Sequence, residues 1–349
     1  MLKKSSKMGT NLKDLILTKE IHLEDLKGKM LAVDSFNLLY QFLSTIRQRD
    51  GTLLKDSQGR VTSHLTGLFS RTTRLMHHGI KLAFVFDGKP PELKQKEREK
   101  RKTAKQEALK LYKEAKKRED IELMKKYASR TSILTAEMIK ESKELINALG
   151  LPVVQAPSEG EAQVSKIVND KNAFAGVSED FDSLLYGIPK LVKNLSITGR
   201  RKFKASYVTI KPKIINLSEN LNNLKIDQDQ LIVLAILIGT DYNPGGVKGI
   251  GPKNALKLVK KHEHDFDNLF KEAKWEENFD FPWTDIYYLI KKMPVEKDYN
   301  MKIEKMNPGK LFELLVEEHD FSKERVEKQI ESLIKVESKK QQKGLGDWL

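Results

Sequence analysis

The chain has 349 residues, of which 39% are hydrophobic and 32% charged, a composition typical of a globular protein and not of a disordered one. It contains no cysteine, which excludes disulfides, thiolate zinc sites and cysteine nucleophiles. Its net charge of +14 favours a polyanionic partner, most commonly nucleic acid, over the alternative that the charge only keeps the protein soluble.

Short buried strands followed by helical patterns are expected along the chain. In order, the strands cover residues 30–33, 82–86, 153–155 and 174–177, and an apolar helix then ends just before Asp241. This alternation predicts an α/β fold with a mostly parallel central sheet flanked by helices. No apolar run approaches the ~20 residues of a membrane span, and the first residues lack the apolar core of a secretory signal, so we expect no membrane partner and a protein that stays inside the cell.

Residues 89–118 differ in composition from the rest of the chain. Thirteen of these thirty residues are Lys or Arg and five are Glu. A narrow apolar stripe at helical spacing runs through the segment and consists of Ala104, Ala108, Leu111, Tyr112 and Ala115. Because so thin a stripe buries little surface, the pattern predicts a basic helix partly detached from the core. The alternative is a solvated surface helix with i,i+4 ion pairs.

Acidic side chains follow the predicted strands at the point where each one ends. The ligands of open α/β sheets bind at the carboxyl ends of the strands, and oxygen donors without Cys or clustered His favour Mg²⁺ or Mn²⁺ over zinc. A single acid in such a loop is more often a cap, and Ser158-x-x-Glu161 fits a capping box. A set of six is harder to explain in that way: Asp34, Asp87, Glu159, Glu161, Asp180 and Asp182.

The spacing of these acids sets a geometric condition. Residues i and i+2 diverge by about 200° on a regular helix, so Glu159 and Glu161 converge only if Glu159 lies at an irregular helix start. Likewise, Asp180 and Asp182, which flank Phe181, converge only if the backbone there is not a regular helix. In a basic protein without cysteine, such a site suggests two-metal hydrolysis of a phosphodiester, with two ions about 4 Å apart and basic side chains that stabilise the developing charge.

Two further motifs lie toward the C-terminus. Residues 239–261 are glycine-rich and open onto a predicted helix at 253–261, whose free N–H groups can hold a backbone phosphate without reading sequence. The alternative is a plain helix-loop-helix turn. At the end of the chain, one helical turn would place an aromatic and two leucines on one side, which favours a partner site over a tail that docks on its own domain: Gln342, Leu345, Trp348 and Leu349.

These motifs together resemble the structure-specific 5′-nuclease superfamily, and most closely its flap endonuclease family. The resemblance covers residues 8–349 and rests on motifs that occur in the family's order: VDSFNLLYQFL, VFDGKPPELK, QAPSEGEA, SEDFDSLL, GTDYNPGGVKGIGPK and the terminal QKGLGDWL. The chain ends directly after the tail, which resembles the archaeal branch. Archaeal-type membership implies a cytoplasmic location with the chromosome, and a eukaryotic source would imply the nucleus.

The resemblance implies roles for individual residues. Asp34, Asp87, Glu159 and Glu161 would bind a first Mg²⁺, with Asp180, Asp182 and Asp241 binding a second and Mn²⁺ able to substitute. Lys94 and Arg101 match a basic catalytic pair at the base of a helical arch. Substrate DNA would be contacted by Tyr40, which stacks on a base, and by Arg47, Thr62, Arg71, Gly246, Lys248, Gly249, Gly251 and Lys253.

It also implies an organisation of the chain. Residues 8–335 would form a single nuclease domain, with the arch and cap at about 89–132 and a helix-two-turn-helix motif at about 230–262. A K⁺ ion would bind the carbonyls of Gly246, Val247 and Ile250. The tail at 336–349 would bind the trimeric sliding clamp (PCNA) through Gln342, Leu345, Trp348 and Leu349. Residues 1–7 precede the family's usual Met-Gly start and are either untranslated or a basic extension near the DNA.

The implied activity is cleavage of branched DNA near the junction of a 5′ flap and a duplex, with 5′-3′ exonuclease activity, by a monomer that acts in Okazaki-fragment maturation and base excision repair. The nearest alternatives are another 5′-nuclease branch, such as an exonuclease or a bubble-cutting repair nuclease. The short insertion between the acidic blocks and the terminal clamp motif argue against the bubble cutter. A non-catalytic DNA-binding clamp adaptor would have no need of the carboxylates.

Overall fold

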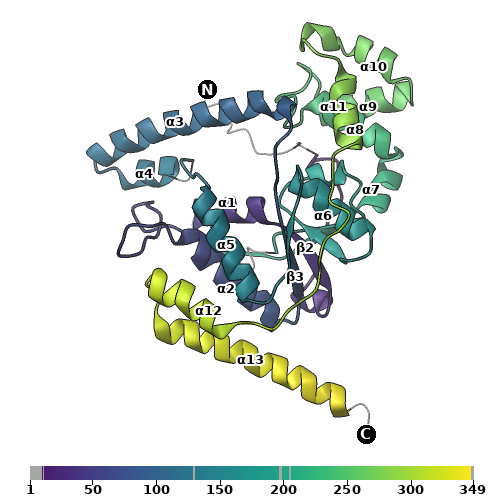
Figure 1. Cartoon of the computed structure of the whole chain (residues 1–349). Helices are drawn as coiled ribbons and strands as arrows, with labels where there is room; N and C mark the ends of the chain where they lie inside the picture. The colour runs from purple at the N-terminus through teal and green to yellow at the C-terminus, as the bar shows by residue number, and fades with distance from the viewer. Residues whose placement is uncertain (1–9, 11, 129, 196–198, 204–205, 347–349) are drawn as a thin grey trace.

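A central sheet of seven strands organises the molecule (Figure 1). The computed structural model describes residues 10, 12–128, 130–195, 199–203 and 206–346. The strand order is β1-β9-β6-β5-β2-β3-β4, and the four pairs from β6 to β4 are parallel whereas β9 is antiparallel to both neighbours. The strands are β1 (Lys19–Glu20), β2 (Met30–Asp34), β3 (Lys81–Phe86), β4 (Val153–Gln155), β5 (Ala175–Val177), β6 (Lys190–Lys193) and β9 (Lys213–Asn216).

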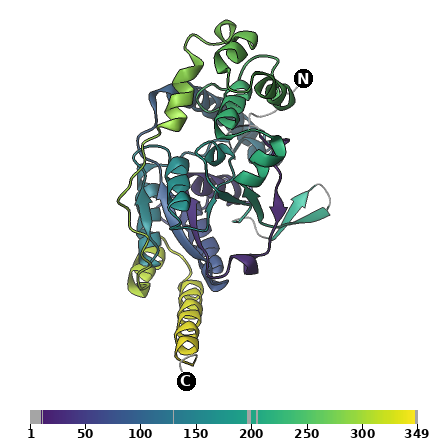
Figure 2. The same ribbon diagram turned by 90° about the vertical axis from the view of Figure 1, so that its right-hand side faces the viewer.

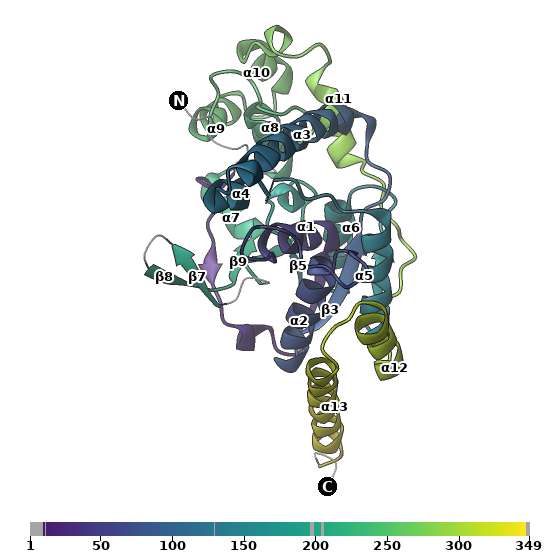
Figure 3. The ribbon, with the colours of Figure 1, turned by 90° about the vertical axis from the view of Figure 1, so that its left-hand side faces the viewer.

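The four predicted strands are therefore confirmed to within a residue or two at their ends, and the mostly parallel sheet is confirmed. β1, β6 and β9 were not predicted. β1 has only two exposed residues, and β6 (KLVK) and β9 (KIIN) each hold two adjacent apolar residues between polar ends, which is too short a pattern to separate from a loop. A separate hairpin of β7 (Gly199–Phe203) and β8 (Ser206–Ile210) projects from the body (Figure 3).

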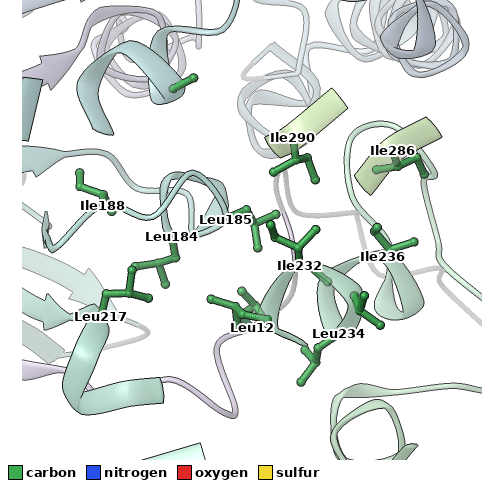
Figure 4. Close-up of a cluster of buried hydrophobic side chains, with 14 of the residues drawn as sticks. Leu12, Leu184, Leu185, Ile188, Leu217, Ile232, Leu234, Ile236, Ile286 and Ile290 are labelled. Carbon is green, nitrogen blue, oxygen red and sulfur yellow. The ribbon is translucent and has the colours of Figure 1, made fainter. Parts of the chain in front are cut away.

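Helices cover both faces of the sheet, so alternate residues of each central strand enter different cores. Leu31 and Val33 of β2 pack into one core with helices α1 (Ser35–Thr45), α2 (Ser63–His77) and α5 (Ala136–Ala148). Ala32, between them, packs into the other core with α6 (Gly160–Asn169) and α8 (Gln228–Ile238). Figure 4 shows part of this second core, where Ile232 and Ile236 of α8 lie near Ile286 and Ile290 of α11 (Trp283–Lys291).

The basic segment forms a long helix that stands away from the sheet. The turn η2 (Glu92–Lys94) leads into α3 (Gln95–Lys117). The next helix, α4 (Ile121–Ala128), runs back alongside α3, and both lie above the strand ends (Figure 1). Only two members of the predicted stripe, Ala108 and Ala115, are buried, whereas Leu111 stays 40% exposed. The expectation of a partly detached basic helix is thus confirmed.

The glycine-rich loop connects α8 to α9 (Pro252–His262), beside the short helices α10 (Phe266–Glu272) and η4 (Trp275–Glu277). The remaining helical segments are η1 (Leu23–Leu26), η3 (Asp182–Leu184), α7 (Leu217–Leu224), α12 (Pro308–Phe312), the π-helical turn η5 (Glu313–Glu318) and α13 (Lys323–Gly346). An irregular stretch of residues 293–307 connects α11 to α12 along the side of the molecule (Figure 2).

α13 is the last element and projects away from the sheet (Figure 2). It continues as helix across residue 336, where the tail was expected to begin. Trp348 and Leu349 of the expected clamp peptide lie outside the described residues, as do the side chains of Gln342 and Leu345 and the N-terminal extension 1–7. In the described part of the chain, no helix has the length and apolar character that crossing a membrane requires.

Candidate active site

The predicted acidic residues gather at one edge of the sheet. β5, β2, β3 and β4 are adjacent and parallel, so their carboxyl ends meet at the same edge. Asp34 ends β2, Asp87 follows β3, Glu159 and Glu161 follow β4, and Asp180 and Asp182 follow β5. Asp241 joins them from the end of α8, since its charge acts on both Asp180 and Asp182.

Asp34 is held between two elements. One of its oxygens accepts the backbone N–H of Asn37 at 3.1 Å as the N-cap of α1, and the other lies 3.3 Å from the Ser178 hydroxyl. Burial, followed by the neighbouring charges of Asp87 and Asp180, raises its pKa from 3.8 to about 8. A carboxyl so strongly destabilised as an anion needs a cation nearby to stay ionised at neutral pH.

Asp87 is placed by a glycine on the next loop. The N–H of Gly160 donates to Asp87 Oδ1 at 2.9 Å, and a Cβ at position 160 would lie 2.3 Å from the same oxygen. Only glycine therefore permits this contact. Burial and the adjacent Glu159 raise the pKa of Asp87 to about 6.

The geometric condition for the two glutamates is met. Glu159 is the N-cap residue of α6 with extended backbone (φ −72°, ψ 125°), and Glu161 lies in the first helical turn. Burial, then Asp182 and Asp34, raise the pKa of Glu161 well above its usual value. The alternative of a Ser158 capping box is wrong, because Ser158 donates instead to the carbonyl of Lys89 at 3.0 Å.

Asp180 and Asp182 follow β5 on a loop tied to distant segments. The Asn37 side chain donates to Asp180 Oδ2 at 2.7 Å, and the N–H of Thr10 donates to Asp182 Oδ1 at 2.8 Å. Burial, then Asp241 and Asp180, raise the pKa of Asp182 to about 6. The Thr10 contact places the beginning of the described chain directly at the acidic edge.

The two basic residues of the arch bind the acidic edge as ion pairs. Lys94 Nζ lies 2.6 Å from Glu159 Oε2 and 3.2 Å from Asp241 Oδ2, and Arg101 donates to Asp241 Oδ1 at 2.7 Å. Although burial opposes the charged form, these carboxylates raise the pKa of Lys94 well above its usual value. Burial likewise opposes ionisation of Asp241, but the two cations hold its pKa below the ordinary range.

The donor chemistry of this edge fits hard divalent cations. The side chains are all carboxylates, buried or half-buried, and neighbouring acidic charges raise the pKa values of Asp34, Glu161 and Asp182. Among the described residues, no three acidic or histidine side chains converge closely enough to form a ready-made ligand set. Two of the carboxylates, Glu159 and Asp241, are instead paired with Lys94 and Arg101.

The residues expected to contact substrate are only partly gathered at this edge. The Tyr40 ring lies 5.1 Å from Lys105 Nζ of the arch, and the charges of Arg101 and Asp87 also reach its hydroxyl. Arg47 turns inward and donates to the Gly51 carbonyl at 2.8 Å and to the Ser132 hydroxyl at 2.7 Å. Thr62 is buried before α2, whereas Arg71 is half-buried on α2.

The glycine-rich loop is tightly folded at Gly246. Its φ is +62°, and a Cβ there would lie 2.4 Å from the Leu237 carbonyl oxygen. The carbonyl of Val247 already accepts the N–H of Ile250 at 3.1 Å. Lys248, Gly249, Gly251 and Lys253 are exposed, with Gly251 the N-cap of α9, so this surface is open to a phosphate backbone.

Sequence reasoning missed several residues at the site. Asn37 binds Asp180, and Lys193 at the end of β6 interacts electrostatically with Asp180, Asp182 and Glu161. Tyr186 and Tyr242 share a hydrogen bond of 2.8 Å behind the carboxylates and lie close to Glu159. Asn37 lies three residues after Asp34, a spacing that could have indicated an N-cap contact, whereas no local signal marks Lys193.

The fold and the site define a class of protein: an α/β protein whose carboxylate-lined sheet edge lies against the basic helix α3. Comparison with known proteins identifies the class more closely. Residues 8–108 match the XPG N-terminal domain and residues 150–241 the XPG I-region. Flap endonuclease 1 of Thermococcus onnurineus is 49% identical, over 98% of this chain and 99% of that protein.

Two solved structures are similar to this chain over more than nine tenths of its length. The flap endonuclease-1 of Methanococcus jannaschii matches with a TM-score of 0.75 and 40% identity, over 95% of this chain and all of that one. The catalytic core of Rad2 in complex with DNA substrate matches with a TM-score of 0.64 and 25% identity, over 91% of this chain and 96% of that one. The chain belongs to the flap endonuclease family.

Proposed function

We propose that this chain is a 5′ flap endonuclease, a metal-dependent hydrolase that cleaves a phosphodiester of branched DNA near the junction of a single strand and a duplex. The observation that carries the proposal is the placement of carboxylates at the neighbouring ends of four adjacent parallel strands, where Lys94 and Arg101 pair with two acidic residues. A DNA-binding adaptor would have no use for so many buried, mutually repelling acids.

The carboxylates divide into two candidate ligand groups. We assign Asp34, Asp87, Glu159 and Glu161 to a first Mg²⁺, and Asp180, Asp182 and Asp241 to a second, with Mn²⁺ as a substitute. When bound, such ions lower the pKa of a water and polarise the scissile phosphate. Asp34, Glu159 and Asp182 are buried, which strengthens the charge interactions around them.

The chain's own residues bind and orient the DNA. Lys94 and Arg101 come from the arch and reach the carboxylate edge, so the same ammonium and guanidinium can stabilise negative charge that develops on a phosphate there. Tyr40, beside Lys105, presents an aromatic ring on which a base can stack. The exposed Lys248 and Lys253 near the start of α9 would hold the duplex backbone.

We propose further binding partners and a cellular role. The terminal residues Gln342, Leu345, Trp348 and Leu349 would bind the trimeric sliding clamp, and the carbonyls of Gly246, Val247 and Ile250 a K⁺ ion. The protein would act as a monomer, with the chromosome, in Okazaki-fragment maturation and base excision repair. Affinity for DNA should fall steeply with salt, since phosphate contacts supply most of it.

One assay tests the central proposal. Labelled 5′-flap, nicked-duplex and bubble substrates are incubated with the full chain in Mg²⁺ and in EDTA. We expect metal-dependent cleavage of the flap near its junction, slower cleavage of the nicked duplex and little of the bubble. If the chain binds the flap substrate but cleaves it in neither Mg²⁺ nor Mn²⁺, the protein is a DNA-binding adaptor instead.

A further inference from the structure

The loop after β5 carries Asp180 and Asp182, and two elements hold it besides the Thr10 contact with Asp182. On one side, Asn37 of α1 donates to Asp180 Oδ2 at 2.7 Å and accepts the N–H of Glu179 at 3.3 Å. The N–H of Asp180 also donates to the Ser178 hydroxyl at 3.2 Å. These contacts fix one face of the loop but leave Phe181 and the Glu179 carbonyl to be held by another element.

That element is the end of β6. The ammonium of Lys193 donates to the Glu179 carbonyl and lies 3.7 Å from the centroid of the Phe181 ring. The next residue, Asn194, has a left-handed backbone (φ 61°), and its N–H donates to Glu179 Oε1 at 2.7 Å. Lys193 therefore contacts the residues on both sides of Asp180 in the sequence.

Lys193 is also a third cation near the carboxylates, besides Lys94 and Arg101. Burial lowers the pKa of its ammonium, while Glu179, Asp180, Glu161 and Asp182 favour the charged form. Among the charges around Asp180, Lys193 has the largest stabilising effect on its ionised state. A side chain in this place could either position the acidic loop or simply compete with metal ions for it.

We infer that Lys193 is a positioning residue, which holds the Glu179 carbonyl and the Phe181 ring on either side of Asp180 and so aims the Asp180 and Asp182 carboxylates at a divalent cation. The inference rests on the metal assignment proposed above. When the ion binds, a loop that is already fixed does not lose the conformational entropy that a mobile backbone would lose on ordering. Groups that orient metal ligands typically change metal affinity or activity by about 10- to 100-fold when they are removed.

The test compares Lys193→Met with Lys193→Arg, which keeps the charge and the ability to donate to a carbonyl. Lys190→Met is the matched control, because Lys190 lies on the same strand and contacts the Phe174 ring at 4.3 Å instead of the acidic loop. Binding of Mn²⁺ and Mg²⁺ to the full chain without DNA is measured by calorimetry, together with the melting temperature and flap affinity in EDTA.

We expect Lys193→Met to weaken metal binding about 10-fold or more, with Lys193→Arg retaining most of the affinity and Lys190→Met all of it. Tighter metal binding by Lys193→Met would show that Lys193 only repels cations, and would overturn the inference. So would a lower melting temperature with unchanged metal affinity, or a loss confined to flap affinity, which would make Lys193 a phosphate contact.

Asp180→Ala separates this inference from the assignment on which it depends. If Asp180→Ala weakens metal binding and Lys193→Met does not, the positioning role of Lys193 is refuted while the metal assignment stands. If Asp180→Ala also leaves the metal affinity unchanged, the assignment of the second site is itself wrong, and the inference falls with it.

Discussion

The guanidinium of Arg101 lies 2.7 Å from a carboxylate oxygen of Asp241, although the two residues are 140 positions apart. This ion pair joins the arch helix α3 to the loop that follows α8, so the arch and the helix-loop-helix region meet at the carboxylate edge. Arg101 is held in addition by Glu97, four residues earlier on α3, at 2.9 Å. The same guanidinium is available to a phosphate that displaces Asp241.

Arg101→Gln is expected to reduce flap cleavage in saturating Mg²⁺ by about 100- to 1000-fold, because it removes a cation placed where negative charge develops. Single-turnover rates measure the loss. Lys102→Gln is the control, since it removes an equal charge from an exposed position on the same helix. Similar rates for the two variants would contradict a specific role for Arg101.

Asp180→Ala is expected to reduce cleavage on the order of 100-fold or more while flap binding in Ca²⁺ stays nearly unchanged, because a metal carboxylate acts on the chemical step more than on DNA affinity. Asp170→Ala serves as the comparison, since Asp170 lies at the far end of α6 and pairs with Lys166 at 2.5 Å. Undiminished turnover by Asp180→Ala in Mg²⁺ would refute the assignment of the acidic edge.

The stability of the metal-free protein should fall as pH rises from about 4 to 8. The folded-state pKa values of Asp34, Asp87 and Asp182 are raised from 3.8 to about 8, 6 and 6. In this window the folded state binds more protons than the unfolded state, so the free energy of unfolding decreases with pH. Urea unfolding in EDTA at pH 5 and pH 8 measures the difference.

Mg²⁺ should restore the stability that is lost at pH 8, because the bound cation takes over the role of the proton. Asp34→Asn, which cannot ionise, should flatten the pH dependence in EDTA. A metal-free protein that is more stable at pH 8 than at pH 5 would show that the carboxylates are already neutralised by Lys94, Arg101 and Lys193.

Glu141→Ala should destabilise the fold by about 1–3 kcal/mol, because it leaves the buried His64 ring nitrogen without its hydrogen-bond partner. Glu141 Oε2 lies 2.9 Å from His64 Nε2, and Glu141 Oε1 lies 3.4 Å from His319 Nε2; both histidine side chains are inaccessible to solvent. Glu144→Ala is the control on the same helix, where an exposed pair with Lys140 at 3.9 Å should contribute less than ~1 kcal/mol. Equal free energies of unfolding for the two variants would contradict the prediction.

Gly246→Ala should cost about 1–3 kcal/mol of stability, because alanine is strained at a φ of +62° and its Cβ would contact the Leu237 carbonyl. Gly251→Ala provides the contrast, since no atom lies within 4 Å of a Cβ at that position. Thermal melting of both variants checks the prediction, and a loss of equal size at Gly251 would show that the loop lacks the tight packing seen at Gly246.

The sequence by itself determined the class of fold and the identity of the acidic side chains. Central strands such as β2 and β3 are largely apolar runs, with an aspartate as the last residue of β2 and directly after β3, and these features are local, so they can be read without tertiary information. The glycine-rich loop and the basic helix were predicted for the same reason, since their composition reflects backbone geometry and exposure at those positions.

Tertiary structure alone decided how these groups pair. The order of β5, β2, β3 and β4 brings their ends together, and the contacts of Lys94 with Glu159, Arg101 with Asp241 and Thr10 with Asp182 join segments 65, 140 and 172 positions apart. Lys193 was missed for that reason: a lysine that ends a four-residue strand has no local signature, and its significance comes only from the loop packed against it. Sequence periodicity reports which face of an element is buried, whereas electrostatic partners are set by how the elements meet in space.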